Sequence, residues 1–87
     1  MLNIQRKDRS EGPVYLQVRN QIEEQIRNKE IASGEQLPQP AALAQKLSVD
    51  KGEIQRAYFE LEQTGLIKKA ARKDFLSGKE VTTYSVG

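Results

Sequence analysis

Apolar residues recur at helical spacing in three stretches of the chain, with polar residues between them. The first stretch follows Pro13, which is favoured at a first helical position because its missing N–H is not needed there. The spacing predicts an amphipathic helix of about four turns, which Ser33-Gly34 breaks. Its apolar stripe repeats every four residues: Val14, Val18, Ile22 and Ile26.

The second stretch is short and begins at Pro40, because Pro38 cannot lie inside a helix whereas Pro40 can start one. Gln39 would be a poor N-cap for this helix. We predict two turns that end near Leu47. The small apolar face consists of Ala41, Leu43, Ala44 and Leu47.

The third stretch, residues 50–65, has helix-capping signals at both ends. Asp50 and Glu53 have the spacing of a capping box, with Asp in place of Ser or Thr, and Gly65 fits the left-handed position after a helix. We predict a third helix whose apolar face lies in the core, with Tyr15 also in the core. That face consists of Ile54, Ala57, Tyr58 and Leu61.

The residues after the third stretch lose the helical period. LIKK and VTTYSV have β character, and Ser77-Gly78 is a turn signal between them. We predict an antiparallel hairpin with a long, basic connection, in which Tyr84 packs against the body. The order of elements is that of a winged helix-turn-helix, mainly α with a small β-hairpin. We expect one domain over residues 1–87, divided into an N-terminal arm (1–12), three helices (13–64) and the wing hairpin (65–87).

The composition excludes several classes of function. The 87 residues contain no cysteine and no histidine, which removes disulfides, thiolate metal sites and the commonest general base. There is no catalytic constellation and no Gly-rich phosphate loop, so we expect no enzyme, cofactor, metal or small-molecule site. No apolar run has the roughly 18–20 residues of a membrane span, and the polar start lacks a secretory signal. We therefore expect a cytoplasmic protein without a membrane partner.

Charge is distributed unevenly along the chain. The net charge of +2 is too small by itself to indicate a nucleic-acid partner. Residues 50–64 contain two basic and four acidic residues, a net charge of −2, whereas residues 65–87 contain five basic and two acidic ones, a net charge of +3. The third helix is thus acidic, and the hairpin carries the positive charge.

The stretches PVYLQV, EQLP and LAQKLSVDKGEIQRAYFELEQTGLI resemble the winged-helix domain of GntR-type bacterial transcription regulators over roughly residues 10–69. The resemblance implies a third helix in the DNA major groove, a wing at the adjacent minor groove or backbone, and dimers on two-fold operators. It also implies a separate C-terminal effector domain, so the chain is either an isolated domain or the N-terminal piece of a longer regulator. The pieces at the family's spacing are Leu37-Pro38, Leu43-Ala44, Leu47, Val49, Ala57-Tyr58, Leu61-Glu62 and Gly65-Leu66-Ile67.

The departures from the family pattern fall on its DNA-contacting face. The family's Ser-Glu-Arg after Leu-Pro is replaced by Gln39-Pro40-Ala41, so Ala41 stands at the position of a DNA-contacting arginine. The third helix opens with DKGEIQ in place of Ser-Arg-x-Thr-Val-Arg. Its acids, Asp50 and Glu53, either cap the helix or weaken its affinity for phosphate. The wing tip is longer than the family's Gly-x-Gly and contains Ala71, Arg72, Lys73 and Asp74.

Double-stranded DNA is the expected partner. Glutamine pairs with adenine, arginine pairs with guanine, and wing cations contact phosphates. The alternatives are a solvated helix face and a sheet edge protected by charge. The candidate DNA-binding residues are Lys51, Gly52, Gln55 and Arg56 on the third helix and Lys69, Arg72 and Lys73 on the wing.

Phe59 indicates a different function. It shares the outward face of the third helix with Gln55, because the two residues are four apart. An exposed aromatic there suggests a protein contact, either in a homodimer or in a winged helix repurposed as an interaction module with weak or no DNA binding. The alternative is that Phe59 packs against the hairpin or a neighbouring helix.

Overall fold

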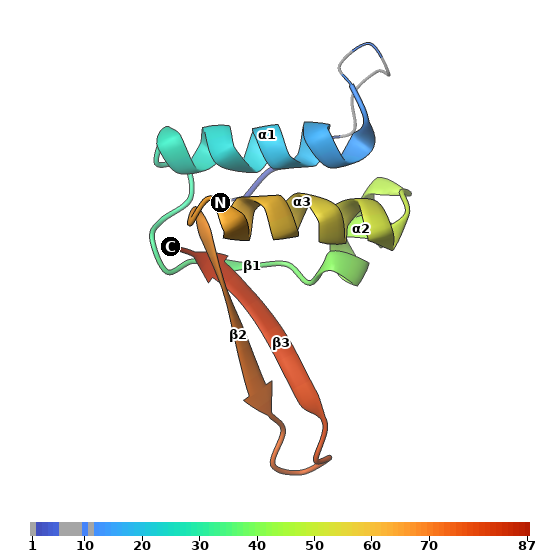
Figure 1. Cartoon of the computed structure of the whole chain (residues 1–87), viewed down its shortest axis with the longest axis vertical. Coiled ribbons are helices and arrows are strands. Elements are labelled where there is room, and N and C mark those ends of the chain that lie inside the picture. The colour runs from blue at the N-terminus through green and yellow to red at the C-terminus, as the bar shows by residue number, and fades with distance from the viewer. Residues whose placement is uncertain (1, 6–9, 11) are drawn as a thin grey trace.

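The computed structural model describes residues 2–5, 10 and 12–87 and confirms the winged helix-turn-helix (Figure 1). Three helices form a body, and a long hairpin extends away from it. A three-stranded antiparallel sheet, ordered β1-β3-β2, joins the hairpin to the body. No helix among the described residues is long and apolar enough to cross a membrane. The elements are α1 (Val14–Arg27), β1 (Gln36–Leu37), α2 (Pro40–Leu47), α3 (Lys51–Gln63), β2 (Ile67–Lys73) and β3 (Glu80–Val86).

The helices begin and end where local chemistry favours it. Asp50 Oδ1 accepts from the backbone amide of Gly52 at 3.3 Å, which caps the start of α3. Gly65 follows the end of α3 with a φ of 80°, a conformation that glycine adopts without strain. α1 ends at Arg27, earlier than the predicted break, because Lys29 adopts a positive φ of 58° and turns the chain.

The core is centred on α3, as the apolar spacing predicts. Every residue of the predicted stripe has a relative exposure of 0%: Ile54, Ala57, Tyr58 and Leu61. Around this stripe lie buried residues of α1, α2 and the wing base, including Val18, Ile22, Leu43, Ile67 and Val86. The burial of one stripe fixes the rotation of α3 about its axis. The polar residues on its other sides are therefore held in defined directions.

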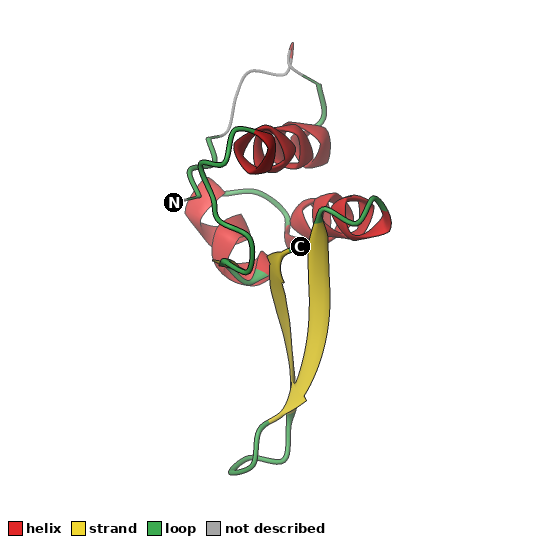
Figure 2. Ribbon diagram, turned by 90° about the vertical axis from the view of Figure 1, so that its left-hand side faces the viewer, coloured by secondary structure: helices red, strands yellow, loops and turns green. Residues whose placement is uncertain are grey.

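The wing differs from the prediction in two ways. β2 reaches Lys73, so four of the five basic residues of the hairpin lie on a paired strand, and the connection is confined to residues 74–79. The prediction of a long, basic connection is wrong, because continuous pairing with β3 overrides the low β propensity of the KKAARK run. The second difference is the short strand β1, which pairs Leu37 with Tyr84. Figure 2 shows the hairpin as a narrow ribbon that leaves the helices.

Where the structure describes it, the N-terminal arm packs along α1. The amide of Asn3 donates to Gln25 Oε1 at 2.9 Å, and Gln25 Nε2 donates back to the carbonyl of Asn3. Gln5 and Gln21 form the same pair of bonds one turn earlier on the helix. Ile4, between them, is only 5% exposed. Residues 1, 6–9 and 11 of the predicted arm lie outside the residues that the structure describes.

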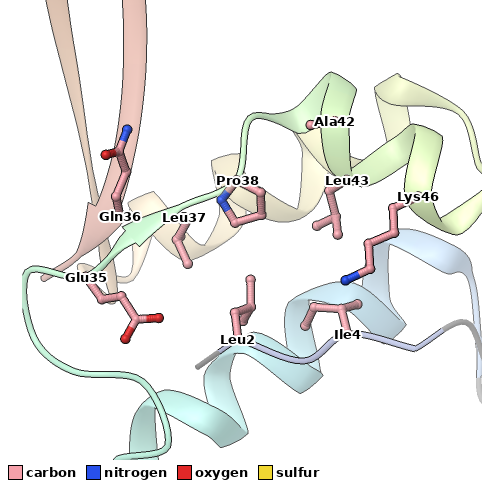
Figure 3. A pocket seen from close by; sticks show the side chains of 9 residues that line it. All are labelled: Leu2, Ile4, Glu35, Gln36, Leu37, Pro38, Ala42, Leu43 and Lys46. Carbon is pink, nitrogen blue, oxygen red and sulfur yellow. The ribbon is translucent and has the colours of Figure 1, made fainter.

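An apolar hollow of about 500 Å³ lies between this arm and α2 (Figure 3). Glu35 and Lys46 stand at its two ends. Among the described residues there is no group of three or more side chains suited to hold a metal ion. The apolar lining consists of Leu2, Ile4, Leu37, Pro38, Ala42 and Leu43.

Candidate nucleic-acid interface

A second hollow, which we call the basic groove, lies where α2, α3 and the base of the wing meet. It measures about 320 Å³. Among the described residues no acidic side chain lines it, and two ammonium groups stand beside two side-chain amides. This combination suits a polyanion whose base edges present hydrogen-bonding groups. The lining residues are Gln39, Pro40, Ala41, Lys51, Gln55, Lys69, Thr82 and Tyr84.

Contacts between residues far apart in sequence hold the walls of the basic groove together. Gln39 does not cap α2; its Nε2 instead donates to the carbonyl of Thr82 at 2.6 Å and ties α2 to β3. The Tyr58 hydroxyl donates to the carbonyl of Pro38 at 2.8 Å. The ring of Tyr58 meets Tyr84 edge-on, with centroids 4.9 Å apart. Burial raises the pKa of Tyr58 well above its usual value, so this donor keeps its proton at neutral pH.

Two of the three acidic residues of α3, Glu53 and Glu60, contact α1. Glu53 Oε2 accepts from the backbone amide of Tyr15 at 2.9 Å and therefore caps the first turn of α1. The prediction of a reciprocal capping box is wrong, because Glu53 reaches across to α1 while Asp50 caps α3 alone. Glu60 Oε1 lies 4.0 Å from Arg19 Nε on α1. Asp50 therefore caps the third helix as interpreted, whereas Glu53 caps α1 and not its own helix.

Arg56 lies on the α1 side of α3, apart from the basic groove. Its guanidinium carbon is 3.8 Å from the centroid of the Tyr15 ring, and its Nε is 3.7 Å from Glu60 Oε2. Gly52 is exposed in the first turn of α3 and does not line the groove either. The structure thus separates Arg56 and Gly52 from the other two helix candidates.

The three wing candidates lie on two faces of the hairpin ribbon. Successive residues of a strand point to opposite faces, so Lys69 and Lys73 share one face and Arg72 lies on the other. The strand register agrees, because directly opposite residues have side chains on the same face of the ribbon. Lys69 is opposite Tyr84, which lines the basic groove, whereas Arg72 is opposite Val81, which does not. Lys73 therefore lies on the same face as the basic groove, but it is opposite Glu80, and the neutral Ala71 separates it from Lys69.

Phe59 remains uncovered, with a relative exposure of 59%. The interpretation that it packs against the hairpin or a neighbouring helix is therefore wrong. Helical spacing places Phe59 on the same side of α3 as Lys51 and Gln55, about two turns after Lys51 and one turn after Gln55.

Sequence reasoning missed two features of this region. Phe75 and Leu76, in the wing connection, have fully exposed side chains; two adjacent large apolar residues beside the Ser77-Gly78 turn were an available signal. The bond between Gln39 and Thr82 has no local signal, because its partners are 43 residues apart. Only the folded arrangement reveals it.

Three comparisons place the chain among known proteins. The model of the family described as "Bacterial regulatory proteins, gntR family" matches residues 14–75. The uncharacterized HTH-type transcriptional regulator YhcF of Bacillus subtilis (strain 168) is 36% identical over 59 residues, which are 68% of this chain and 49% of the relative. The match thus spans about half the length of that relative. YtrA from Sulfolobus acidocaldarius, a GntR-family transcription factor, has a TM-score of 0.73 at 29% identity, over 97% of this chain and 80% of that chain.

Proposed function

The chain belongs to the gntR family of bacterial regulatory proteins, and from that premise we propose that it binds double-stranded DNA through the basic groove. The observation that carries the proposal is the lining of the groove, where two lysines and two glutamines from three elements meet without an acid among the described residues. Phosphate contacts supply much of the affinity of DNA-binding domains, so such a surface is what a regulator of this family requires.

In the proposed docking, the N-terminal half of α3 enters the major groove of the DNA. Gln55 faces the base edges, where its amide pairs with N6 and N7 of adenine. Lys51 and Lys69 flank it and contact phosphates on either side. Ala41 supplies no cation where the family has an arginine, so one copy makes few phosphate contacts. We therefore propose that a homodimer on a two-fold site supplies the rest of the affinity.

The proposal extends to the organisation of the chain. Residues 1–87 act as one domain in the bacterial cytoplasm without a cofactor. One hydrophobic core that extends from Ile4 to Val86 supports this organisation. The matching family is one of regulatory proteins and not of enzymes, in keeping with a role in transcriptional regulation.

Fluorescence anisotropy of a labelled duplex, measured from about 20 to 200 mM salt, tests the proposal. Replacing Lys51 and Lys69 together by alanine removes both cations from the basic groove. We expect weaker binding and a salt slope smaller by about 2, because each phosphate contact contributes about 0.9 to that slope.

The matched control replaces Arg27 and Lys46 by alanine, which removes the same charge from outside the groove. Arg27 is 73% exposed at the end of α1, and Lys46 lines the separate apolar hollow. Equal losses in the two double variants would contradict the role of the groove. A wild-type chain that does not bind at the lowest salt would overturn the DNA proposal itself.

A second candidate function rests on the exposure of Phe59. In this proposal the outer end of α3 contacts a protein, either a second copy or another partner. Phe59→Ala should then shift the sedimentation profile toward the monomer without lowering the melting temperature. Unchanged sedimentation and pull-down profiles would together remove the support for this reading.

A further inference from the structure

The wing tip, residues 74–79, presents two large apolar side chains to solvent. Phe75 and Leu76 have relative exposures of 102% and 98%, the highest among the exposed large hydrophobic residues. The tip lies at the end of the hairpin farthest from the helices (Figure 1). Val81, on the strand beside it, is 42% exposed. An adjacent pair of this kind has no role in the core, so it calls for a contact outside the chain.

Hydrogen bonds within the tip hold this pair outward. Asp74 Oδ1 accepts from the amide of Leu76 at 3.1 Å, and Oδ2 accepts from the Ser77 hydroxyl at 3.0 Å. These donors, the Leu76 amide first, lower the pKa of Asp74, so its carboxylate is ionised at neutral pH. The amide of Gly78 donates to the carbonyl of Asp74 at 2.8 Å and closes the turn. The tip is therefore an ordered loop that presents the two apolar side chains to solvent.

The basic residues near Phe75 and Leu76 indicate which kind of partner the tip contacts. Lys69, Arg72, Lys73 and Lys79 all lie on the same hairpin, and residues 65–87 have a net charge of +3 from five basic and two acidic residues. A partner protein with an apolar surface would explain the two apolar side chains but not the basic residues near them. DNA combines a polyanionic backbone with an apolar stack of bases behind it, and so matches both properties of the tip.

The length of the wing fits the same partner. From Lys69 at the basic groove to Lys73 the strand spans about 13 Å, because four residues advance about 3.3 Å each, and Phe75 lies beyond the end of β2 in the tip. Half a helical turn of B-DNA, which separates neighbouring major and minor grooves, is about 17 Å. With α3 in the major groove, the tip therefore reaches the adjacent minor groove. The longest dimension of the molecule, 45 Å, runs along the hairpin and provides this reach.

We propose that Phe75 and Leu76 form an apolar wedge that enters the minor groove, unstacks a flexible base step and bends the duplex. This inference rests on the proposed DNA binding and adds a specific action to it. Pyrimidine–purine steps, and thymine–adenine steps above all, are the cheapest to open and are the expected sites. The basic strand behind the wedge holds the bent backbone.

The test uses an alternating thymine–adenine duplex of about 30 base pairs, in which every register places a flexible step near the tip. Some adenines are replaced by aminopurine, a base whose fluorescence rises when it unstacks, and a dye pair on the two ends reports the bend. We expect the wild-type chain to raise aminopurine fluorescence and shorten the end-to-end distance at saturation.

The decisive variant replaces Phe75 and Leu76 together by serine. We expect it to lose both signals, to bind no more than about tenfold more weakly, and to keep the wild-type salt slope, because no phosphate contact is removed. The variant F75L/L76M keeps two apolar side chains of wedge-forming type and should restore both signals. Both sites are fully exposed, so far-UV circular dichroism should show the same fold for all three chains.

Each result has one meaning. Wild-type binding with no change in fluorescence or end-to-end distance overturns the wedge and leaves the proposed DNA binding intact. Signals that survive in the serine variant also overturn the wedge. No wild-type binding at the lowest salt overturns both proposals. If the serine variant instead dissociates a homodimer in sedimentation and leaves the DNA signals unchanged, the tip is a protein contact and the wedge is wrong.

Discussion

On the side of α3 that faces α1, Glu53 caps the neighbouring helix, and Arg56 and Glu60 contact each other or α1. On the side that faces the basic groove, Lys51 and Gln55 line a surface that has no acid among the described residues. The same helix is acidic in total and basic where it meets the groove. The net charge of a helix therefore says little about its partner, because neighbouring elements engage one side and leave the other available.

The largest expected effect comes from placing an acid on the side of α3 that lines the basic groove. Lys51→Glu replaces a cation of the basic groove with an anion, and we expect roughly 100-fold weaker DNA binding, or about 2.7 kcal/mol. Anisotropy at low salt measures this loss. Arg27→Glu makes the same change of charge at the end of α1 and should cost far less. Equal losses in the two variants would show that only net charge matters.

Tyr58→Phe tests how the groove side is built. The variant leaves the carbonyl of Pro38 without its hydroxyl donor, and we expect a loss of about 1–2 kcal/mol in the free energy of unfolding. Urea denaturation measures it. Tyr84→Phe keeps the ring contact with Tyr58 and serves as the control, with little expected change. If the two variants lose the same stability, the hydrogen bond to Pro38 does not secure the groove.

Glu53→Ala tests the side toward α1. It removes the acceptor at the first turn of α1, and we expect a loss of about 1 kcal/mol in stability, with DNA affinity changed by less than about threefold. Glu62→Ala removes an acid from the same helix and is the control for charge. A tenfold gain in DNA affinity specific to Glu53→Ala would mean that this carboxylate faces the DNA after all.

The smallest effect is expected for Arg56→Ala. Loss of the contact with the Tyr15 ring should lower stability by about 0.5–1 kcal/mol and leave DNA binding nearly unchanged. If Arg56 instead reads a guanine, the variant should lose about 1–3 kcal/mol of discrimination at one base pair. Binding to duplexes that differ at single positions separates these outcomes.

Apolar periodicity predicted the three helices and the core of α3, because burial of a stripe is a local pattern that the sequence displays. It did not predict which polar side of α3 meets α1, since that depends on how separate helices pack. The capping box shows the difference: Asp50 acts within its own helix as predicted, whereas Glu53 bonds to Tyr15, 38 residues away.

The wing was harder to predict than the helices. The run from Lys68 to Lys73 has a composition typical of a connection, yet its pairing with β3 makes it a strand. β1 has only two residues, too few to carry a period. Of the candidate site, Lys51, Gln55 and Lys69 meet at the basic groove. Gln39, which lines the same groove, is tied to Thr82 by a hydrogen bond that no local pattern encodes.

A two-dimensional amide NMR titration with duplex DNA at low salt tests most directly which side of α3 contacts DNA. We predict that signals shift at the start of α2, at Lys51 and Gln55, and along the wing from Lys69 to its tip. The amides of α1, including Tyr15, should keep their positions. Shifts centred on α1 and the Arg56 side of α3, with the basic groove unperturbed, would contradict the account.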